Sequence, residues 1–134
     1  MKRKEFEKLA VEGIDALPEW VRKKMTNVAV LIEDAPSEGT LREEGTEEGE
    51  TLLGLYRGVP LSERGSDYGV GGTLPDTITL FQIPLEEEGE GKPDKIREAV
   101  AITVWHEVAH HFGIDEDRVG ELERQRFGGH SPRK

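Results

Sequence analysis

The order of helix-like and strand-like segments along the 134-residue chain predicts a fold of the α+β class. An amphipathic helical pattern opens the chain, short apolar segments of strand type follow, and a long segment without Gly or Pro comes late. Helices repeat about every 3.6 residues and strands every 2, so the spacing of apolar side chains separates the two types. This length suits a single domain, and we expect one domain over residues 1–134.

The first predicted helix covers Arg3 to Leu17, because its apolar side chains recur at helical spacing. These side chains are Phe6, Leu9, Ala10, Ile14 and Leu17. Pro18 interrupts the pattern, since proline does not fit a helix interior. A short second helical turn around Trp20, Val21 and Met25 should pack on the same core.

Three short apolar segments predict β-strands. They are Val28–Ile32, Thr51–Tyr56 and Thr77–Ile83. The first is a continuous apolar run rich in β-branched residues, which favours a buried strand, and the third alternates as a strand with two unlike faces does. The acidic segment at about 34–50, the Gly-rich segment at 65–72 and the acidic segment 86–92 predict loops.

The longest predicted helix covers Lys95 to Phe112 and should be largely buried, because apolar residues are dense in it. Asp94 is the predicted N-cap, and Gly113 suits the position that follows a helix end. A further helix from Glu116 to about Arg126 can be capped by Asp115. The tail at about 128–134 is expected to be frayed.

The formal net charge of −10 argues against nucleic acid and anionic membranes as partners. No apolar run suggests a signal peptide or a membrane-spanning helix, so a cytoplasmic location is expected. The absence of cysteine excludes disulfides, a cysteine nucleophile and cysteine-ligated zinc. One Asn and two Gln beside many Glu and Arg residues are typical of thermophile proteins.

Residues His106 to His110 read His-Glu-Val-Ala-His within the predicted long helix. Positions i and i+4 share one helix face, so His106 and His110 can bind one metal ion together. Glu107 stands beside them and can take a proton from a metal-bound water and pass it to a leaving amine. Two imidazoles and a carboxylate suit Zn²⁺ and leave one position open.

The alternative interpretation is a hydrogen-bonded pair of core histidines without metal. The short pattern arises by chance in on the order of one in a hundred chains of this size. Its place in a buried helix favours the metal site, because unpartnered polar groups are costly there. Once Gly113 has turned the chain, Glu116 can supply the third ligand, with Asp115 as the alternative. His111 lies about 100° around the helix from His110 and should not bind the same ion easily.

The segment Val104 to Arg118, VWHEVAHHFGIDEDR, resembles the signature of the small bacterial zincin-like metallopeptidase family, also called minimal zincins. Further similar segments are Glu5-Phe6, Leu17-Pro18, Asn27–Val30, Leu53–Tyr56, Gly58–Leu61, Glu63–Gly65 and Pro75–Leu80. The resemblance therefore covers nearly the whole chain, except for the acidic loop and the tail. At the third-ligand position the family often has Asp, whereas this chain has Glu116.

The resemblance implies a compact α+β domain in which a small mixed sheet packs on the helix that carries the HExxH motif. It also implies zinc in a cleft, with His106 and His110 as ligands and Glu107 as the catalytic acid and base. The expected activity is hydrolysis of peptides or small proteins. A non-catalytic zinc-binding or interaction module and a hydrolase of non-peptide amides are the alternatives.

A peptidase also needs a group that stabilises the oxyanion and an edge strand that holds the substrate. The candidates for the oxyanion group, by their chemistry alone, are Tyr56, Arg57, Arg64 and Tyr68. We expect the third strand, Thr77–Ile83, to be the edge on which substrate lies. The Gly-rich segment lacks the ending of a phosphate-binding loop, so it should border the cleft instead.

Overall fold

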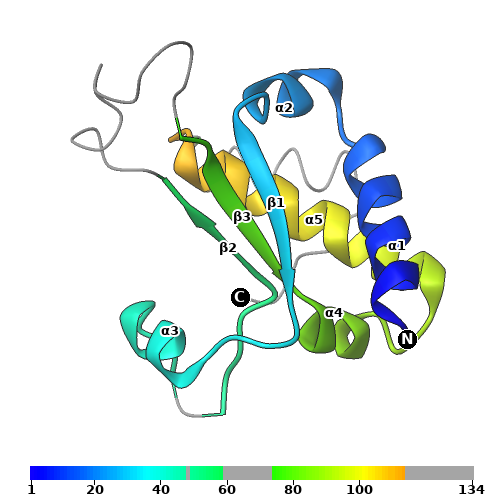
Figure 1. Ribbon diagram of the computed structural model, residues 1–134, viewed down its shortest axis with the longest axis vertical. Helices are drawn as coiled ribbons and strands as arrows, with labels where there is room; N and C mark the ends of the chain where they lie inside the picture. Colours follow the sequence, from blue (N-terminus) through cyan, green and yellow to red (C-terminus); the bar gives the residue numbers. More distant parts are fainter. Residues whose placement is uncertain (48, 59–73, 114–134) are drawn as a thin grey trace.

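The computed structural model describes residues 1–47, 49–58 and 74–113, and Figure 1 shows the arrangement of its helices and strands. In chain order the elements are α1 (Arg3–Asp15), α2 (Glu19–Lys24), β1 (Val28–Glu33), α3 (Glu38–Glu43), β2 (Gly54–Arg57), β3 (Asp76–Phe81), α4 (Gln82–Glu88) and α5 (Pro93–His111). The predicted α+β class, with a small mixed sheet packed on the long helix, is confirmed.

The described sheet has three strands in the order β1-β3-β2. Strand β3 pairs with β1 in parallel and with β2 in antiparallel orientation, so it is the central strand. The expectation that Thr77–Ile83 forms the edge strand is therefore wrong. Both sides of β3 are already hydrogen-bonded, and among the described residues the open edges belong to β1 and β2.

The helix α5 forms the centre of the core. It packs against α1 on one side and against β2 and β3 on another, as Figure 1 shows. Ten of its residues are buried, which agrees with the predicted long buried helix. The largest fully buried side chains of this core include Phe6, Leu80, Ile96, Val100 and Val104. A continuous apolar layer between helices and sheet holds α5 in a fixed position, and that position determines where its last turn lies.

The N-terminal helices agree with the sequence pattern, with α1 ending at Asp15 and Pro18 standing directly before α2. The start of α5 differs from the prediction. The N-cap is Lys92, with Pro93 in the first turn, and Asp94 lies inside the helix. Pro93 suits that place because its missing N–H would have no partner in the first turn.

Two predicted loops contain short helices. In the acidic segment, the Ser37 hydroxyl accepts a hydrogen bond from Thr40 N at 3.1 Å and so caps α3. Leu41 of α3 packs on a small cluster of Leu52, Leu55 and Phe81. The other helix, α4, extends from the last residues of the predicted third strand into the predicted loop at 86–92. A capping hydroxyl stabilises the start of α3, and α4 buries Gln82, Pro84 and Leu85. The charge content of the two segments indicated neither feature.

Strand β1 is less buried than its apolar sequence predicts. The side chains of Val30 and Leu31 are 38% and 45% exposed, whereas Val28 and Ile32 pack against the main core. The reason is the position of β1 at one edge of the sheet.

Among the described residues, no helix combines the length and the apolar character needed to cross a bilayer.

Candidate metal centre

The last two turns of α5 bring His106 and His110 onto one helix face. Their rings stack with centroids 4.8 Å apart and planes inclined by 27°. His106 is half-buried and His110 is exposed, so the pair lies where the core meets solvent. This is the arrangement expected from the i, i+4 spacing.

The end of α5 also follows the sequence. Gly113 has a φ of +75°, and its N–H donates to His110 O at 3.2 Å. Glycine enters this left-handed region without the steric cost that a Cβ would bring. The predicted helix-ending role of Gly113 is confirmed, since α5 ends at His111 and Gly113 follows the C-cap residue Phe112.

Glu107 points to the open edge of β2. Its Oε1 accepts a hydrogen bond from Tyr56 N at 3.1 Å. Phe81 N donates to Leu53 O at 3.0 Å, which turns the backbone of Leu53 toward β3 and that of Tyr56 toward the edge. The carboxylate thus occupies a backbone donor that another strand would otherwise use.

Close contact between β2 and α5 makes this hydrogen bond possible. A Cβ on Gly54 would lie 2.7 Å from Thr103 Cγ2 and 3.2 Å from Thr79 O. Only a residue without a side chain lets the strand approach the helix so closely. The glycine places the β2 backbone within reach of Glu107.

A cavity of about 200 Å³ opens beside Glu107. Its walls come from the segment after α3, from the residues before β2 and from β2 itself; they include Glu44, Glu50, Leu52, Gly54 and Leu55. Glu107 is half-buried and forms one wall. The motif helix and the β2 edge therefore share one concave surface.

His111 lies on a different side of α5 from the histidine pair. Its ring stacks on Tyr56 with centroids 3.9 Å apart, and its Nε2 is 3.6 Å from Asp76 Oδ2. The Tyr56 hydroxyl donates to the same Asp76 oxygen at 2.7 Å. These contacts connect the C-terminal end of α5 with the last residues of β2 and the first residue of β3. They agree with the expectation that His111 does not join His106 and His110.

The candidate oxyanion residues have separate surroundings. The Tyr56 hydroxyl is engaged with Asp76, and the Arg57 guanidinium is 3.6 Å from the Glu43 carboxylate and 3.5 Å from the Thr40 hydroxyl. An oxyanion role for either would require it to leave these partners. Arg64, Tyr68, Asp115 and Glu116 lie outside the described residues, as does the predicted helix from Glu116.

The two imidazoles fit a zinc ion as two of its usual donors, because their rings share one face and reach the surface. Within the three described ranges, no group of three or more His, Cys, Asp or Glu residues could hold a metal ion. The predicted third ligand, Glu116, is not among those residues. The described part of the site is therefore a pair of nitrogen donors with an adjacent carboxylate.

Sequence reasoning missed Asp76 and the role of β2 as the edge beside the motif helix. Asp76 stands at the start of β3, and its partners Tyr56 and His111 are distant in sequence. Only the antiparallel register, in which Arg57 faces Thr77, brings them together. The sequence offered no signal for the edge position, since the predicted second strand, Thr51–Tyr56, was no shorter than the first, and only the structure shows β2 as four residues long.

Comparison with known proteins supports the fold described above. The family model of zincin-like metallopeptidases matches residues 25–126, which include β1, the sheet and α5. A solved structure of a conserved hypothetical protein from Thermus thermophilus is similar, with a TM-score of 0.51 and 26% sequence identity over 83% of this chain and 94% of that chain. A search of curated proteins found no match. From the family match and the fold, this chain belongs to the zincin-like metallopeptidase family.

Proposed function

We propose that the protein is a zinc-dependent metallopeptidase that hydrolyses peptide bonds. The observation that carries the proposal is the position of Glu107. It follows His106 directly on α5, and its carboxylate lies at the β2 edge beside a cavity of about 200 Å³. A carboxylate that can exchange protons is thus next to a pair of metal-binding side chains and to a surface that can hold a peptide.

In this proposal His106 and His110 hold zinc, with Glu116 as third ligand and Asp115 as the alternative. Bound zinc supplies a water of lowered pKa and polarises the scissile carbonyl. Glu107 accepts the proton of the attacking water and returns it to the amine that leaves. The Tyr56 N–H keeps the Glu107 carboxylate oriented during both transfers.

The substrate would lie along β2 instead of β3. Strand β2 has an open edge, its Gly54 backbone lines the cavity, and Glu107 is at the same edge. An extended peptide can pair through main-chain hydrogen bonds with the part of this edge that Glu107 leaves accessible, at Gly54, while the Tyr56 N–H stays with the Glu107 carboxylate.

The first test measures metal content by elemental analysis after purification without added metal. We expect about one zinc per chain in the wild type and a loss of zinc in His106→Ala/His110→Ala. His111→Ala is the matched control, because it removes an imidazole from the same helix end but from a different face. Failure of the wild type to take up zinc, even when zinc is supplied, would leave only the core-histidine interpretation.

The third ligand can be assigned by comparing Glu116→Gln with Asp115→Asn. Removing a true ligand should weaken zinc binding severely, whereas loss of a helix cap lowers stability by only about 1 kcal/mol. A competitive chelator titration separates the two outcomes. Unchanged affinity in both variants would contradict the proposed ligand set.

Activity is then tested with a mixed peptide library and with small non-peptide amides. Cleavage of peptides that depends on the histidine pair supports the metallopeptidase. Stoichiometric zinc without any hydrolysis would favour the non-catalytic zinc-binding or interaction module. Turnover of non-peptide amides alone would favour a hydrolase of non-peptide amides.

A further inference from the structure

A groove lies between α1 and the edge of β1, away from the HExxH residues. Its volume is about 550 Å³, and apolar side chains form most of its surface, among them Ala10, Val11, Ile14 and Val30. Val11 is 58% exposed and Val30 is 38% exposed. The exposure of large apolar groups in a concave site is characteristic of binding surfaces.

The β1 backbone along this groove has an open hydrogen-bonding position. Asp76 N donates to Asn27 O at 3.1 Å. The backbone N–H and C=O groups of odd-numbered β1 residues therefore point toward β3, and those of even-numbered residues point toward the groove. Val28 N donates to Met25 O at 3.0 Å, whereas the N–H and C=O of Val30 have no partner among the described residues. Val30 can therefore pair with an added extended chain.

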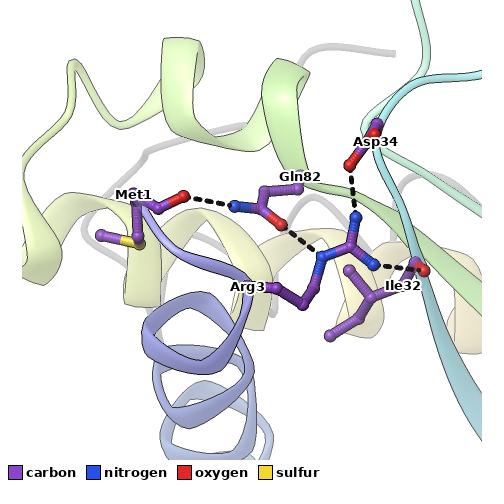
Figure 2. Close-up of polar contacts among 5 residues, drawn as sticks. All are labelled: Met1, Arg3, Ile32, Asp34 and Gln82. Carbon is purple, nitrogen blue, oxygen red and sulfur yellow. Dashed lines mark hydrogen bonds and ion pairs between the residues drawn. The ribbon is translucent and has the colours of Figure 1, made fainter.

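Arg3 lines the groove, and Figure 2 shows that its side chain reaches from α1 to β1. Its Nη1 donates to Ile32 O at 2.9 Å, and its Nε donates to Gln82 Oε1 at 2.7 Å. The remaining nitrogen pairs with the Asp34 carboxylate. With Met25 at one end of β1 and Arg3 at the other, the open stretch of β1 is short and centred on Val30.

The charges at the groove select a cationic occupant. Glu7 and Asp15 line it, and neither carboxylate forms an ion pair or hydrogen bond with a described residue. The one cation among the described lining residues, Arg3, is already paired with Asp34. A second copy of this chain would bring another net charge of −10 and the same carboxylates, so repulsion disfavours it.

From these observations we infer that the α1–β1 groove binds an extended segment of another protein, with alternating apolar residues flanked by Lys or Arg. The segment pairs with Val30 as an added strand, places its apolar side chains over Ala10 and Val11, and presents its cationic ends to Glu7 and Asp15. This site is separate from the proposed peptidase cleft and does not depend on zinc or on Glu107.

The probe is a fluorescein-labelled peptide, Lys-Val-Thr-Val-Thr-Val-Lys with blocked ends, titrated against the full chain at low salt. We expect saturable binding that is about tenfold tighter than that of the same peptide with both Lys replaced by Glu, since attraction is exchanged for repulsion. Equal binding of the two peptides, or no binding, would overturn the inference.

Variants of the groove test the charges. Glu7→Gln/Asp15→Asn should weaken the Lys peptide by about two- to fivefold per carboxylate and reduce the salt dependence of its binding. Glu5→Gln/Glu98→Gln is the matched control, because it removes two exposed carboxylates that do not line the groove. The same loss in both double variants would show a general effect of net charge and contradict the site.

Strand pairing is tested with two N-methylated forms of the probe, one methylated at alternate residues and the other at the residues between them. Only one of the two forms should lose binding, because only one set of N–H groups faces β1. Equal affinities would mean that no strand is added. Self-association of the chain that Val30→Pro abolishes would also overturn the inference, in favour of a second copy in the groove.

Discussion

The two open edges of the sheet offer the same backbone groups but differ in what lies beside them. At the β2 edge, Tyr56 N is occupied by the Glu107 carboxylate, and the adjoining cavity of about 200 Å³ has an acidic wall. At the β1 edge, Val30 faces a larger and mostly apolar groove of about 550 Å³. One edge thus carries a group that can transfer protons, and the other offers only surface for binding.

The difference arises from the helices that the edges meet. Strand β2 lies close to α5 because Gly54 leaves room for Thr103, and α5 carries the HExxH residues. Strand β1 instead faces α1 across the groove, and Arg3 spans the gap. Chemistry is therefore expected where packing is tight, because reacting groups need fixed positions.

The largest expected effect comes from Glu107→Gln. Glutamine keeps a carbonyl oxygen that can accept the Tyr56 hydrogen bond, but it cannot take up a proton. We expect kcat to fall by about 10²- to 10⁴-fold while zinc content stays unchanged. Steady-state kinetics and elemental analysis on the same sample check both points. Wild-type turnover in this variant would remove the proposed chemical distinction between the edges.

The next effect concerns the close packing of β2 on α5. Gly54→Ala should destabilise the fold by about 1–3 kcal/mol, because the added Cβ overlaps Thr103 Cγ2. Thermal and denaturant unfolding measure the change. Thr103→Ser removes that methyl group and should restore part of the loss in the double variant.

Gly39→Ala is the control for this substitution, since its Cβ would come no closer than 3.9 Å to Ser37 Oγ. It should leave stability unchanged or raise it slightly, as alanine is the better helix former. If Gly54→Ala were equally harmless, the tight contact between β2 and α5 would not be what distinguishes this edge.

At the β1 edge, Arg3→Ala removes the bonds to Gln82, Ile32 and Asp34. We expect a loss of about 1–2 kcal/mol, a limited value because solvent screens these partly exposed contacts. Lys4→Ala, on the exposed side of the same helix, should change stability by less than about 0.5 kcal/mol. Equal effects of the two substitutions would show that Arg3 does not connect α1 to this edge.

The smallest expected effect is that of Tyr56→Phe. It deletes the hydroxyl that binds Asp76 but keeps the backbone N–H that binds Glu107, so we expect a stability loss of about 0.5–1.5 kcal/mol. Under this expectation kcat changes by less than about threefold. A fall of about 100-fold or more would instead identify the Tyr56 hydroxyl as the oxyanion donor.

Local patterns were sufficient for several parts of the molecule. Periodicity predicts the long buried helix and the first strand. The end of the helix follows from Gly113, because glycine adopts a positive φ without steric cost. The common face of His106 and His110 follows from the geometry of one helix, since four residues are close to one turn. Such features involve residues that are near one another in sequence, so the sequence by itself determines them.

Strand order and the partners of the site depended on contacts between distant segments. The central position of β3, the exposure of β1 and the meeting of Tyr56, Asp76 and His111 are set by pairing across the sheet and by packing on α5. A strand pattern states which side chains alternate but does not state which neighbour the backbone will pair with. The sequence therefore determined the shared face of the two histidines and the adjacent carboxylate, and only the tertiary structure decided that β2 is the edge beside them.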